Sequence, residues 1–544
     1  MSELLSIAAQ RNLRARERAQ IAVEGVVSAP ANTVQYQSRG RVLVIGGEQA
    51  LLFAPRLLPT LKPEVLVTDG SDESSVPAIH LGLRKLDIAG HLGNFEVTLG
   101  EAGERDHEII RCDLVVDLSP QAQLDIPLPP LGYFHADPDA PLALDALAIE
   151  LVEMVGRFEK PRFFSFDENR CAHGRNGIEG CTRCIDACPA LAIRSLGEQI
   201  EVDPFLCQGG GACATACPSG AIEYALPSPI DLQERVRRLL QIYQQEEGEQ
   251  PMLAFLAGDA SGVPSGDAPH VLWVSVEEVA SVGLEVWLAA LAQGAAAVRL
   301  VHQEPLPLPS AQLLQEQLAI AATLLDSWGY PTDAIACVDA AQFDAEAMPD
   351  WNQPLPPARF AALGTKRQRL FMAIDHLHQQ AVTQPDVIAF DRGAPFGQVE
   401  VDDTRCTLCM ACTSGCPSGA LIAGGEIPRL RFIEANCVQC DICEKTCPEQ
   451  AISITPRLLL DVVARKQPRT LYEEQPFCCV QCGKPFATRR VIETVLGRLG
   501  GNPMFQSERA RRRLQMCEDC RVIDIAQDDE AMQGNLFKGG SHAG

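Results

Sequence analysis

The chain has 544 residues, 22 of them cysteine, and a formal net charge of −25 at pH 7, so it is long enough for several domains. This acidity excludes a general affinity for nucleic acid or anionic membranes and favours docking on basic patches of redox partners, while no apolar stretch is long and uncharged enough to span a bilayer. A high cysteine content without a secretory signal indicates metal binding in a reducing compartment, and we therefore expect a cytoplasmic protein.

The N-terminal part of the chain has the pattern of a helix followed by an α/β domain. Residues 1–39 predict a helical segment, and three short apolar runs of the buried-strand type predict an α/β domain over residues 40–160. The runs cover residues 41–45, 64–68 and 113–117. Gly46 and Gly47 follow the first run, but the full dinucleotide-binding fingerprint is absent, so an ordinary strand-to-helix turn is favoured over a nucleotide site.

Residues 161–226 carry two cysteine motifs that each end in Cys-Pro and predict a ferredoxin-like module. The motifs are Cys171, Cys181, Cys184 and Cys188, then Cys207, Cys213 and Cys217. Two-cluster bacterial ferredoxins use this pattern, and in it the Cys before Pro binds the partner cluster. Aligned with the later copies of the motif, Cys171 becomes a first ligand that an insertion separates from Cys181. The predicted ligands of the first cluster, site I, are Cys171, Cys181, Cys184 and Cys217.

The second motif lacks one ligand. Glycine stands at position 210, where the repeat would place its second cysteine. The second cluster, site II, therefore has only Cys188, Cys207 and Cys213. Site II could hold a three-iron cluster, a four-iron cluster with one iron bound by solvent or another group, or no cluster. We favour an occupied site with three thiolates, for which [3Fe-4S] is the first candidate.

Residues 227–345 repeat the α/β pattern. Strands are expected at 252–256, 271–275 and 297–301, and helices at 284–293 and 311–328. The segment resembles the small flavodoxin-like iron–sulfur subunit associated with heterodisulfide reductases and some hydrogenases. Because Cys337 is the only thiol in the segment, the cysteine ligands of that subunit have no counterparts, and we expect a structural or docking domain. Cys112 and Cys337 are expected to be ordinary buried thiols.

A linker and helix over residues 346–395 precede a second dicluster module at 396–456, in which both motifs are complete. The helix is expected near residues 366–380. One thiolate per iron suits a cubane, so each cluster needs four cysteines. The exchange of the Cys before Pro assigns Cys406, Cys409, Cys412 and Cys447 to one cluster, site III. Cys416, Cys437, Cys440 and Cys443 are assigned to the other, site IV.

Residues 457–530 contain two further CxxC pairs. Cys479, Cys482, Cys517 and Cys520 present four thiolates, which predicts a zinc-ribbon-like segment that binds Zn²⁺. The interval between the pairs exceeds the usual ribbon spacing, so a helical insertion is needed, and residues 490–498 could supply it. A further iron–sulfur or redox site is the alternative. Residues 531–544 are expected to form a tail.

The predicted fold class is α/β plus α+β multidomain, with two dicluster modules, two α/β segments and the zinc-ribbon-like segment. The cysteine string from Cys171 to Cys188 and the terminal Cys482-Gly-Lys-Pro and Cys517-Glu-Asp-Cys segments resemble bacterial cytoplasmic multi-cluster ferredoxin-type proteins. Some members of that family are encoded near formate dehydrogenase genes. The cysteine pattern predicts three [4Fe-4S] clusters, the altered cluster at site II and Zn²⁺ as cofactors.

These features predict an iron–sulfur electron-transfer protein or subunit. It would relay single electrons between a cytoplasmic dehydrogenase and another redox partner, and the resemblance offers formate dehydrogenase as the candidate. No set of residues presents a nucleophile or an acid–base pair, so no catalytic residue is assigned. Two alternatives remain open: a catalytic redox subunit with an open iron at site II, and an accessory factor that matures a metalloenzyme.

Overall fold

The structure is a computed structural model, and it divides into two compact units that are described separately. The first unit contains residues 1–171 and 182–384, and the second contains residues 172–181 and 385–544. The described residues are 6–23, 32–71, 75–100, 107–258, 260–261, 263–264, 267–351, 355–361, 363–425 and 427–528. The expected tail lies outside these residues. Nowhere in the described part of the chain is a helix long and apolar enough to cross a membrane.

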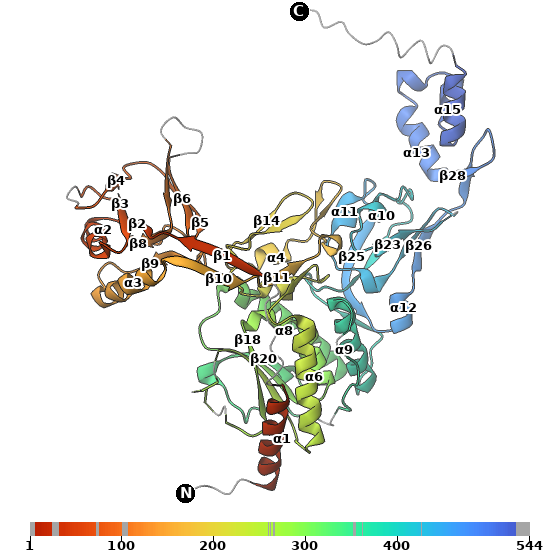
Figure 1. Ribbon diagram of the computed structural model, residues 1–544. Coiled ribbons are helices and arrows are strands. Elements are labelled where there is room, and N and C mark those ends of the chain that lie inside the picture. The colour runs from red at the N-terminus through yellow and green to blue at the C-terminus, as the bar shows by residue number, and fades with distance from the viewer. Residues whose placement is uncertain are drawn as a thin grey trace, which may run out of the picture. The chain divides into compact units, whose positions relative to one another are not determined.

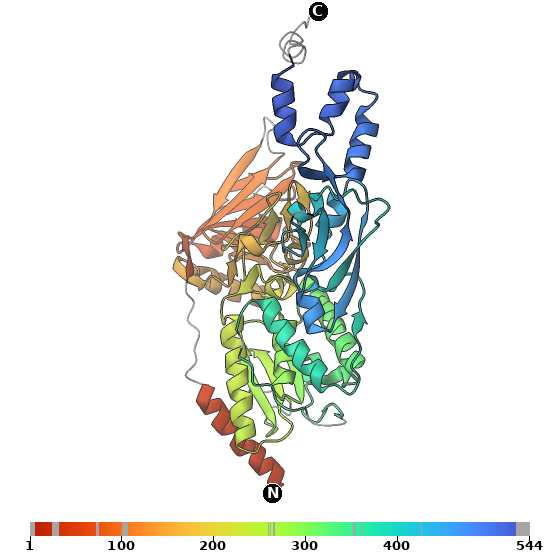
Figure 2. The same ribbon diagram turned by 90° about the vertical axis from the view of Figure 1, so that its right-hand side faces the viewer.

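The expected N-terminal helix is α1 (Ile7–Val23), and it is not isolated. It lies along α6 (Pro229–Gln245) and buries the small side chains of Ala15 and Ala19 (Figure 2). The end of the segment expected to be helical contains strand β1 (Thr33–Ser38), which pairs with β10 (Gly156–Pro161). Alternation of polar and apolar residues in Thr-Val-Gln-Tyr-Gln-Ser is the strand period, and it decides this element.

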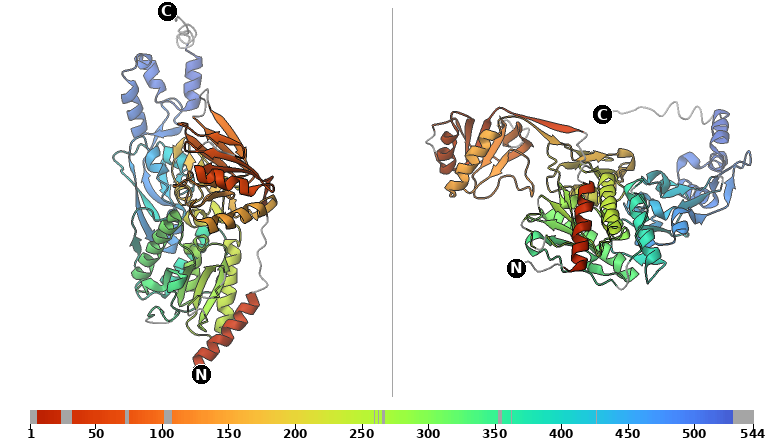
Figure 3. Two further views of the ribbon diagram at one scale, coloured as in Figure 1. Left: turned by 90° about the vertical axis from the view of Figure 1, so that its left-hand side faces the viewer. Right: turned by 60° about the horizontal axis from the view of Figure 1, so that its bottom comes forward.

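The first α/β domain is a five-stranded parallel sheet that has different covers on its two faces (Figure 3). Its strands, in spatial order, are β4 (Ala78–His80), β3 (Lys62–Val67), β2 (Arg41–Gly46), β8 (Leu114–Asp117) and β9 (Tyr133–His135). Val42 and Val44 pack with α2 (Glu48–Phe53) and α3 (Pro141–Glu153). Leu43 and Ile45 pack on an antiparallel sheet, β5 (Leu86–His91), β6 (Asn94–Leu99) and β7 (Glu108–Cys112). The three expected strands are present because neighbouring side chains on a strand point to opposite faces, and here both faces are buried.

The turn at Gly46 and Gly47 does not support a nucleotide site. The strand order matches the first five strands of the dinucleotide-binding fold, in which the phosphates lie at the first strand-to-helix turn. In this chain α2 has only six residues, and the Asp69 carboxylate lies directly against Gly47, where any side chain would collide with it. The position of the carboxylate favours the interpretation of an ordinary turn.

The two cysteine-rich modules share one arrangement of strands and short helices (Figure 1). Each has an outer strand pair, an inner hairpin and two helices that start just before the third ligand of a motif. In the first module these are β11 (Phe164–Phe166) with β16 (Ile222–Tyr224), β14 (Ile193–Ser195) with β15 (Ile200–Val202), α4 (Arg183–Asp186) and α5 (Ala212–Ala216). In the second they are β22 (Gly397–Val401) with β25 (Ile452–Leu459), β23 (Leu421–Ala423) with β24 (Arg429–Phe432), α10 (Ala411–Gly415) and α11 (Ile442–Thr446).

The second α/β domain is a four-stranded parallel sheet in the first unit. Its order is β18 (Val271–Val276), β17 (Met252–Ala257), β19 (Ala297–His302) and β20 (Ile335–Asp339), which is the order of the first four strands of a flavodoxin-like sheet. The helices α7 (Leu284–Ala292) and α8 (Leu308–Trp328) lie where the apolar pattern predicts them. The central strand β17 is buried on both faces, which explains its continuous apolar sequence.

Helix α9 (Lys366–Gln380) joins this domain to the first cysteine-rich module. The ammonium group of Lys366 is buried and donates hydrogen bonds to the carbonyl oxygens of Ala214 and Thr215, at the end of α5, at 2.6 and 2.9 Å. A Lys at this position satisfies carbonyl groups that the short helix leaves without partners. The basic residues at the start of α9 are therefore internal contacts and not an exposed basic face.

Two strands outside the range expected for the second dicluster module, 396–456, pair with its sheets. Strand β21 (Val387–Ala389) pairs with β25, and β26 (Arg469–Glu473) pairs with β24. Residues assigned to the linker and to the zinc-ribbon-like segment thus extend the sheets of the module. Added strands cover the edges that a ferredoxin hairpin would expose to other chains. The segment with the two CxxC pairs therefore begins at β27 (Pro476–Cys478).

Candidate metal centres

The four cysteines assigned to site III line one cavity in the second unit. Cys406, Cys409 and Cys412 approach from the loop before α10, and Cys447 comes from the end of α11. The rest of the cavity is lined mainly by apolar groups such as those of Leu430 and Ile452. Four thiols around one apolar space suit an iron–sulfur cluster, which prefers soft ligands.

The four cysteines assigned to site IV line a second cavity of similar size. Cys437, Cys440 and Cys443 lie on one loop, and Cys416, the residue before Pro417, completes the set. In both cavities the fourth cysteine comes from the opposite motif, which is the exchange that the two-cluster pattern predicts.

The backbone of the ligand loops repeats from motif to motif. The residues on either side of the second ligand have positive φ: 54° and 61° at Leu408 and Met410, and 55° and 65° at Gln439 and Asp441. In the incomplete motif, φ is 81° at Gly209 and 72° at Gly211. Residue 210 thus occupies the same place on the loop as Cys409 and Cys440 do in the complete motifs.

The three thiols assigned to site II lie together in the first unit. Burial raises the pKa of Cys188, Cys207 and Cys213, and for Cys213 the neighbouring Cys207 and Cys188 raise it further. Burial and the proximity of the other thiols therefore oppose ionisation of this group. A Cβ atom at Gly210 would lie 3.5 Å from Cγ of Pro189, which is ordinary contact. The loop therefore has room for a side chain at the position of the absent ligand.

The four cysteines assigned to site I are divided between the two units. Cys171, Cys184 and Cys217 belong to the apolar core of the first module, whereas Cys181 belongs to the second unit. The assignment of these four residues to one cluster stays a prediction.

The insertion before Cys181 forms a hairpin, β12 (Gly174–Arg175) and β13 (Ile178–Glu179), that packs on α11. Nζ of Lys445 donates to the carbonyl of Glu179 at 2.9 Å. A Cβ atom on Gly180 would lie 2.5 Å from Cγ1 of Ile442 and 2.8 Å from the carbonyl oxygen of Cys440, so only glycine permits this approach. Burial raises the pKa of Cys440 to about 12, and Cys181 is among the neighbouring thiols that add to the rise. Within the second unit, the hairpin thus brings a predicted ligand of site I close to one of site IV.

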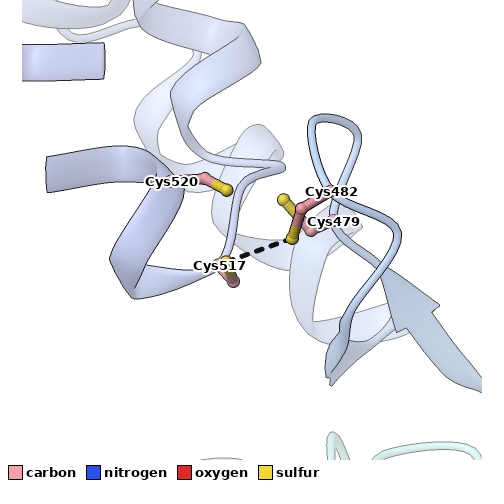
Figure 4. A group of neighbouring side chains, drawn as sticks. All are labelled: Cys479, Cys482, Cys517 and Cys520. Carbon is pink, nitrogen blue, oxygen red and sulfur yellow. Dashed lines mark hydrogen bonds between the residues drawn. The ribbon is translucent and has the colours of Figure 1, made fainter. Parts of the chain in front are cut away.

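The two CxxC pairs at the C-terminal end converge on one point (Figure 4). Cys479 and Cys482 lie on the loop between β27 and β28 (Pro485–Thr488), Cys517 caps α15 (Glu518–Ala526), and Cys520 lies in its first turn. The four Sγ atoms are within 4.8 Å of one another, and those of Cys482 and Cys517 are 3.7 Å apart. A tetrahedron with Zn–S bonds of about 2.3 Å has sulfur–sulfur edges of about 3.8 Å. We call these four residues the four-cysteine site.

Groups around the four-cysteine site shift the pKa values of its thiols. Burial alone would raise the pKa of Cys479, but backbone N–H groups of Cys517, Cys482 and Gln481 outweigh it and lower the pKa to about 6. The hydrogen bond with Cys482 raises the pKa of Cys520 to about 12, because that hydrogen bond stabilises the protonated thiol of Cys520. The expected helical insertion is α13 (Arg489–Leu499). A ribbon-like pair of hairpins is not formed, since the second CxxC pair lies on a helix.

Several groups near the ligands were not identified from the sequence. Backbone N–H groups of Ala192 and Ala451 donate to Sγ of Cys188 and Cys447 at 3.4 and 3.3 Å. The hydroxyl groups of Ser219 and Ser418 lie 3.6 Å from Sγ of Cys217 and Cys416. The Cys-Pro-Ser-Gly-Ala string present in both modules was the available signal for the two serines.

The first α/β domain contacts the loop that leads to site II. Nζ of Lys160, on β10, donates to the carbonyl oxygens of Phe205 and Cys207 at 3.0 and 2.6 Å. The Tyr36 hydroxyl donates to the same carbonyl of Phe205, and His91 stacks on the Phe205 ring. These contacts hold the Cys207 loop from a domain more than 40 residues away in the chain, and no local pattern predicts them.

Cys112 and Cys337, which lie outside the cluster motifs and the four-cysteine site, are ordinary thiols. Cys112 is buried, and burial raises its pKa to about 12. Cys337 is half-buried, and burial raises its pKa to about 11. Both stay protonated near neutral pH, so neither has the thiolate character of a reactive cysteine.

Comparison with known proteins agrees with the cysteine geometry. Residues 165–222 match the family described as a 4Fe-4S dicluster domain, and residues 398–421 match a 4Fe-4S binding domain. The chain contains two ferredoxin-type 4Fe-4S domains. The first match includes Gly210, so the altered motif lies within a recognisable dicluster domain.

Short stretches of the chain are also similar to parts of oxidoreductases. Over 62 residues it is 37% identical to indolepyruvate oxidoreductase subunit IorA of Pyrococcus horikoshii, which is 11% of this chain and 8% of that protein. Over 56 residues it is 38% identical to the archaeal-type glutamate synthase (NADPH) of Thermotoga sp. strain RQ2 and of Thermotoga maritima, which is 10% of this chain and 11% of those proteins. The chain thus spans about a tenth of the length of these relatives. The domains support a role in iron–sulfur electron transfer.

Proposed function

We propose that this protein is an electron-transfer component of an oxidoreductase, with cubane clusters at sites I, III and IV, an altered cluster at site II and Zn²⁺ at the four-cysteine site. The observation that carries the proposal is the pair of cavities in the second module, each with four cysteines contributed by both motifs. When bound, such clusters accept and release single electrons. The cysteines hold them at fixed positions, and the apolar lining excludes water from them.

The hairpin before Cys181 supports a route between the two modules. Gly180 contacts the carbonyl of Cys440, so the predicted ligands Cys181 and Cys440 approach one another in the second unit. We propose that electrons pass between site I and site IV through this contact. An insertion in the first motif would then serve electron transfer, which explains the extra residues between Cys171 and Cys181.

Metal analysis of the anaerobically purified protein tests the proposed cofactors. We expect about fifteen or sixteen iron atoms, a matching amount of sulfide and about one zinc per chain. Electron paramagnetic resonance of the oxidised protein should show the signal of a three-iron cluster. About half of the expected iron, with zinc present, would contradict the assignment of four cluster sites.

A dehydrogenase is the partner class that we propose, and formate dehydrogenase is the first candidate. The relatives named above are oxidoreductases, but no residue of this chain selects formate. Mixing the oxidised protein with formate dehydrogenase and formate should bleach the cluster absorbance, and omitting formate is the control. Bleaching by dithionite but not by the dehydrogenase would exclude this partner while leaving the cluster sites in place.

Site II favours a second candidate function, a redox catalyst with an open iron. The space at Gly210 and the absence of an oxygen or sulfur ligand there leave one coordination position for a substrate. A small molecule that changes the spectrum of this cluster alone would support that function. A spectrum unaffected by any candidate substrate would favour pure electron transfer.

A further inference from the structure

We propose that Gln439 is a positioning residue that raises the reduction potential of the cluster at site IV, and that Ser418 acts in the same direction. This inference rests on the proposed function, because it concerns a cluster bound by Cys416, Cys437, Cys440 and Cys443. Gln439 and Ser418 would set the reduction potential of the cluster at site IV independently of the cluster at site III, which lies in the same module.

Both side chains are placed to donate hydrogen bonds to ligand sulfurs. Nε2 of Gln439 donates to Sγ of Cys437 at 3.3 Å and faces the carbonyl oxygen of Gln398 at 3.5 Å. Both neighbours are acceptors, so only the NH₂ end of the amide fits there. Oγ of Ser418 lies 3.6 Å from Sγ of Cys416, and a thiolate can only accept, so the hydroxyl donates.

The chain keeps this amide at a structural cost. Gln439 is almost fully buried, and its Oε1 has no hydrogen-bond partner in the described part of the chain. A buried acceptor without a partner is unfavourable, and an apolar residue would avoid the penalty. Strand β22 also begins with Gly397, where any Cβ atom would collide with the Gln439 amide. The glycine at position 397 and the Oε1 of Gln439, unpaired among the described residues, are both explained if the amide is needed to donate to Sγ of Cys437.

Site III supplies an internal comparison. Leu408 precedes Cys409 as Gln439 precedes Cys440, and the two residues have nearly the same φ, 54° and 55°. Both side chains are buried, but leucine has no donor. The two sites of one module thus differ by a hydrogen-bond donor at an equivalent backbone position.

The physical effect follows from charge. Reduction adds one electron to the cluster, supplied in the experiment by dithionite, and no proton moves. The reduced cluster carries more negative charge on its sulfurs, so a donor stabilises it more than the oxidised form and raises the potential. Removing the donor must lower the potential of site IV, and adding one at site III must raise the potential of that site.

Reciprocal substitutions in the full-length protein test this inference. In a redox titration followed by electron paramagnetic resonance, Gln439→Leu should shift one component to more negative potential. Leu408→Gln should shift a different component to more positive potential. Ser418→Ala should move the same component as Gln439→Leu, by a smaller amount because its contact with sulfur is longer. Iron and sulfide content should equal those of the unsubstituted protein in all three variants.

The outcomes separate this inference from the proposed function. If the unsubstituted protein lacks iron in the second module, the proposed function fails. If the Gln439→Leu variant is fully loaded with iron and titrates like the unsubstituted protein, the role of Gln439 is wrong and the cluster sites stand. Should Gln439→Leu lose its cluster, Leu408→Gln decides, because an unchanged potential at site III would overturn the inference.

Discussion

Replacing Gly210 with cysteine is expected to convert site II into an ordinary four-iron cluster. The backbone at residues 209 and 211 already has the conformation found beside Cys409 and Cys440, and a Cβ atom at Gly210 meets only Pro189, at 3.5 Å. The new thiolate would therefore supply the fourth ligand without moving the loop. The variant should gain about one iron per chain and lose the three-iron signal in electron paramagnetic resonance.

The matched control for this substitution is Gly210→Ala. Alanine adds the Cβ atom that the loop can accept but no ligand, so its iron content and spectrum should equal those of the unsubstituted protein. If Gly210→Cys also leaves both unchanged, Cys188, Cys207 and Cys213 do not form a cluster site with position 210. The same result would remove the open coordination position on which the catalytic alternative depends.

Loss of one ligand from the four-cysteine site is expected to unfold the C-terminal segment. Among the described residues, the core cluster at the site consists of Cys479, Met516 and Cys517, with Phe486 and Cys520 packed against it, so three of its five members are thiols. Ile492 and Leu514 are further buried apolar residues of the segment. Apolar burial of this extent does not hold a domain of this size without a metal. Structural Zn²⁺ contributes about 10–16 kcal/mol in small zinc domains, and we expect Cys517→Ser to forfeit most of it.

Zinc content and hydrogen exchange measure this effect. Amides of α13 and α15 should lose protection in Cys517→Ser, whereas those of β24 and β26, in the dicluster module, should keep it. Cys478→Ser is the control, because Cys478 is exposed and stands outside the four-cysteine site. Retained zinc and unchanged exchange in Cys517→Ser would contradict a structural metal at this site.

Unfolding of the C-terminal segment should also destabilise the cluster at site III. The Thr488 hydroxyl donates to the carbonyl of Thr407, and the Arg490 guanidinium donates to the carbonyl of Cys406. These contacts cover the first ligand loop of site III. We therefore expect the Cys517→Ser variant to lose iron faster in air than the Cys478→Ser variant does.

Local patterns predicted the main strands of the two α/β domains and helix α9. The strands that contain Val42 and Leu253 and the helix that begins at Lys366 lie where apolar periodicity places them, because each buries one side or both sides along its whole length. Thr33–Ser38 forms a strand at the end of the segment expected to be helical, and its alternation of polar and apolar residues is the local signal for it. No local pattern predicted that β21 and β26 would pair with the sheets of the second module from sequence assigned to its neighbours.

The sequence by itself determined which cysteines could share a metal centre, because ligand spacing is a local property of a loop and cluster chemistry demands thiolates. The tertiary structure decided everything that depends on segments far apart in the chain. It packed the Cys181 hairpin on α11, brought Cys479 and Cys482 to Cys517 and Cys520, and placed a glycine of β22 beside Gln439. These approaches depend on how elements pack, and packing leaves no fixed spacing in the sequence.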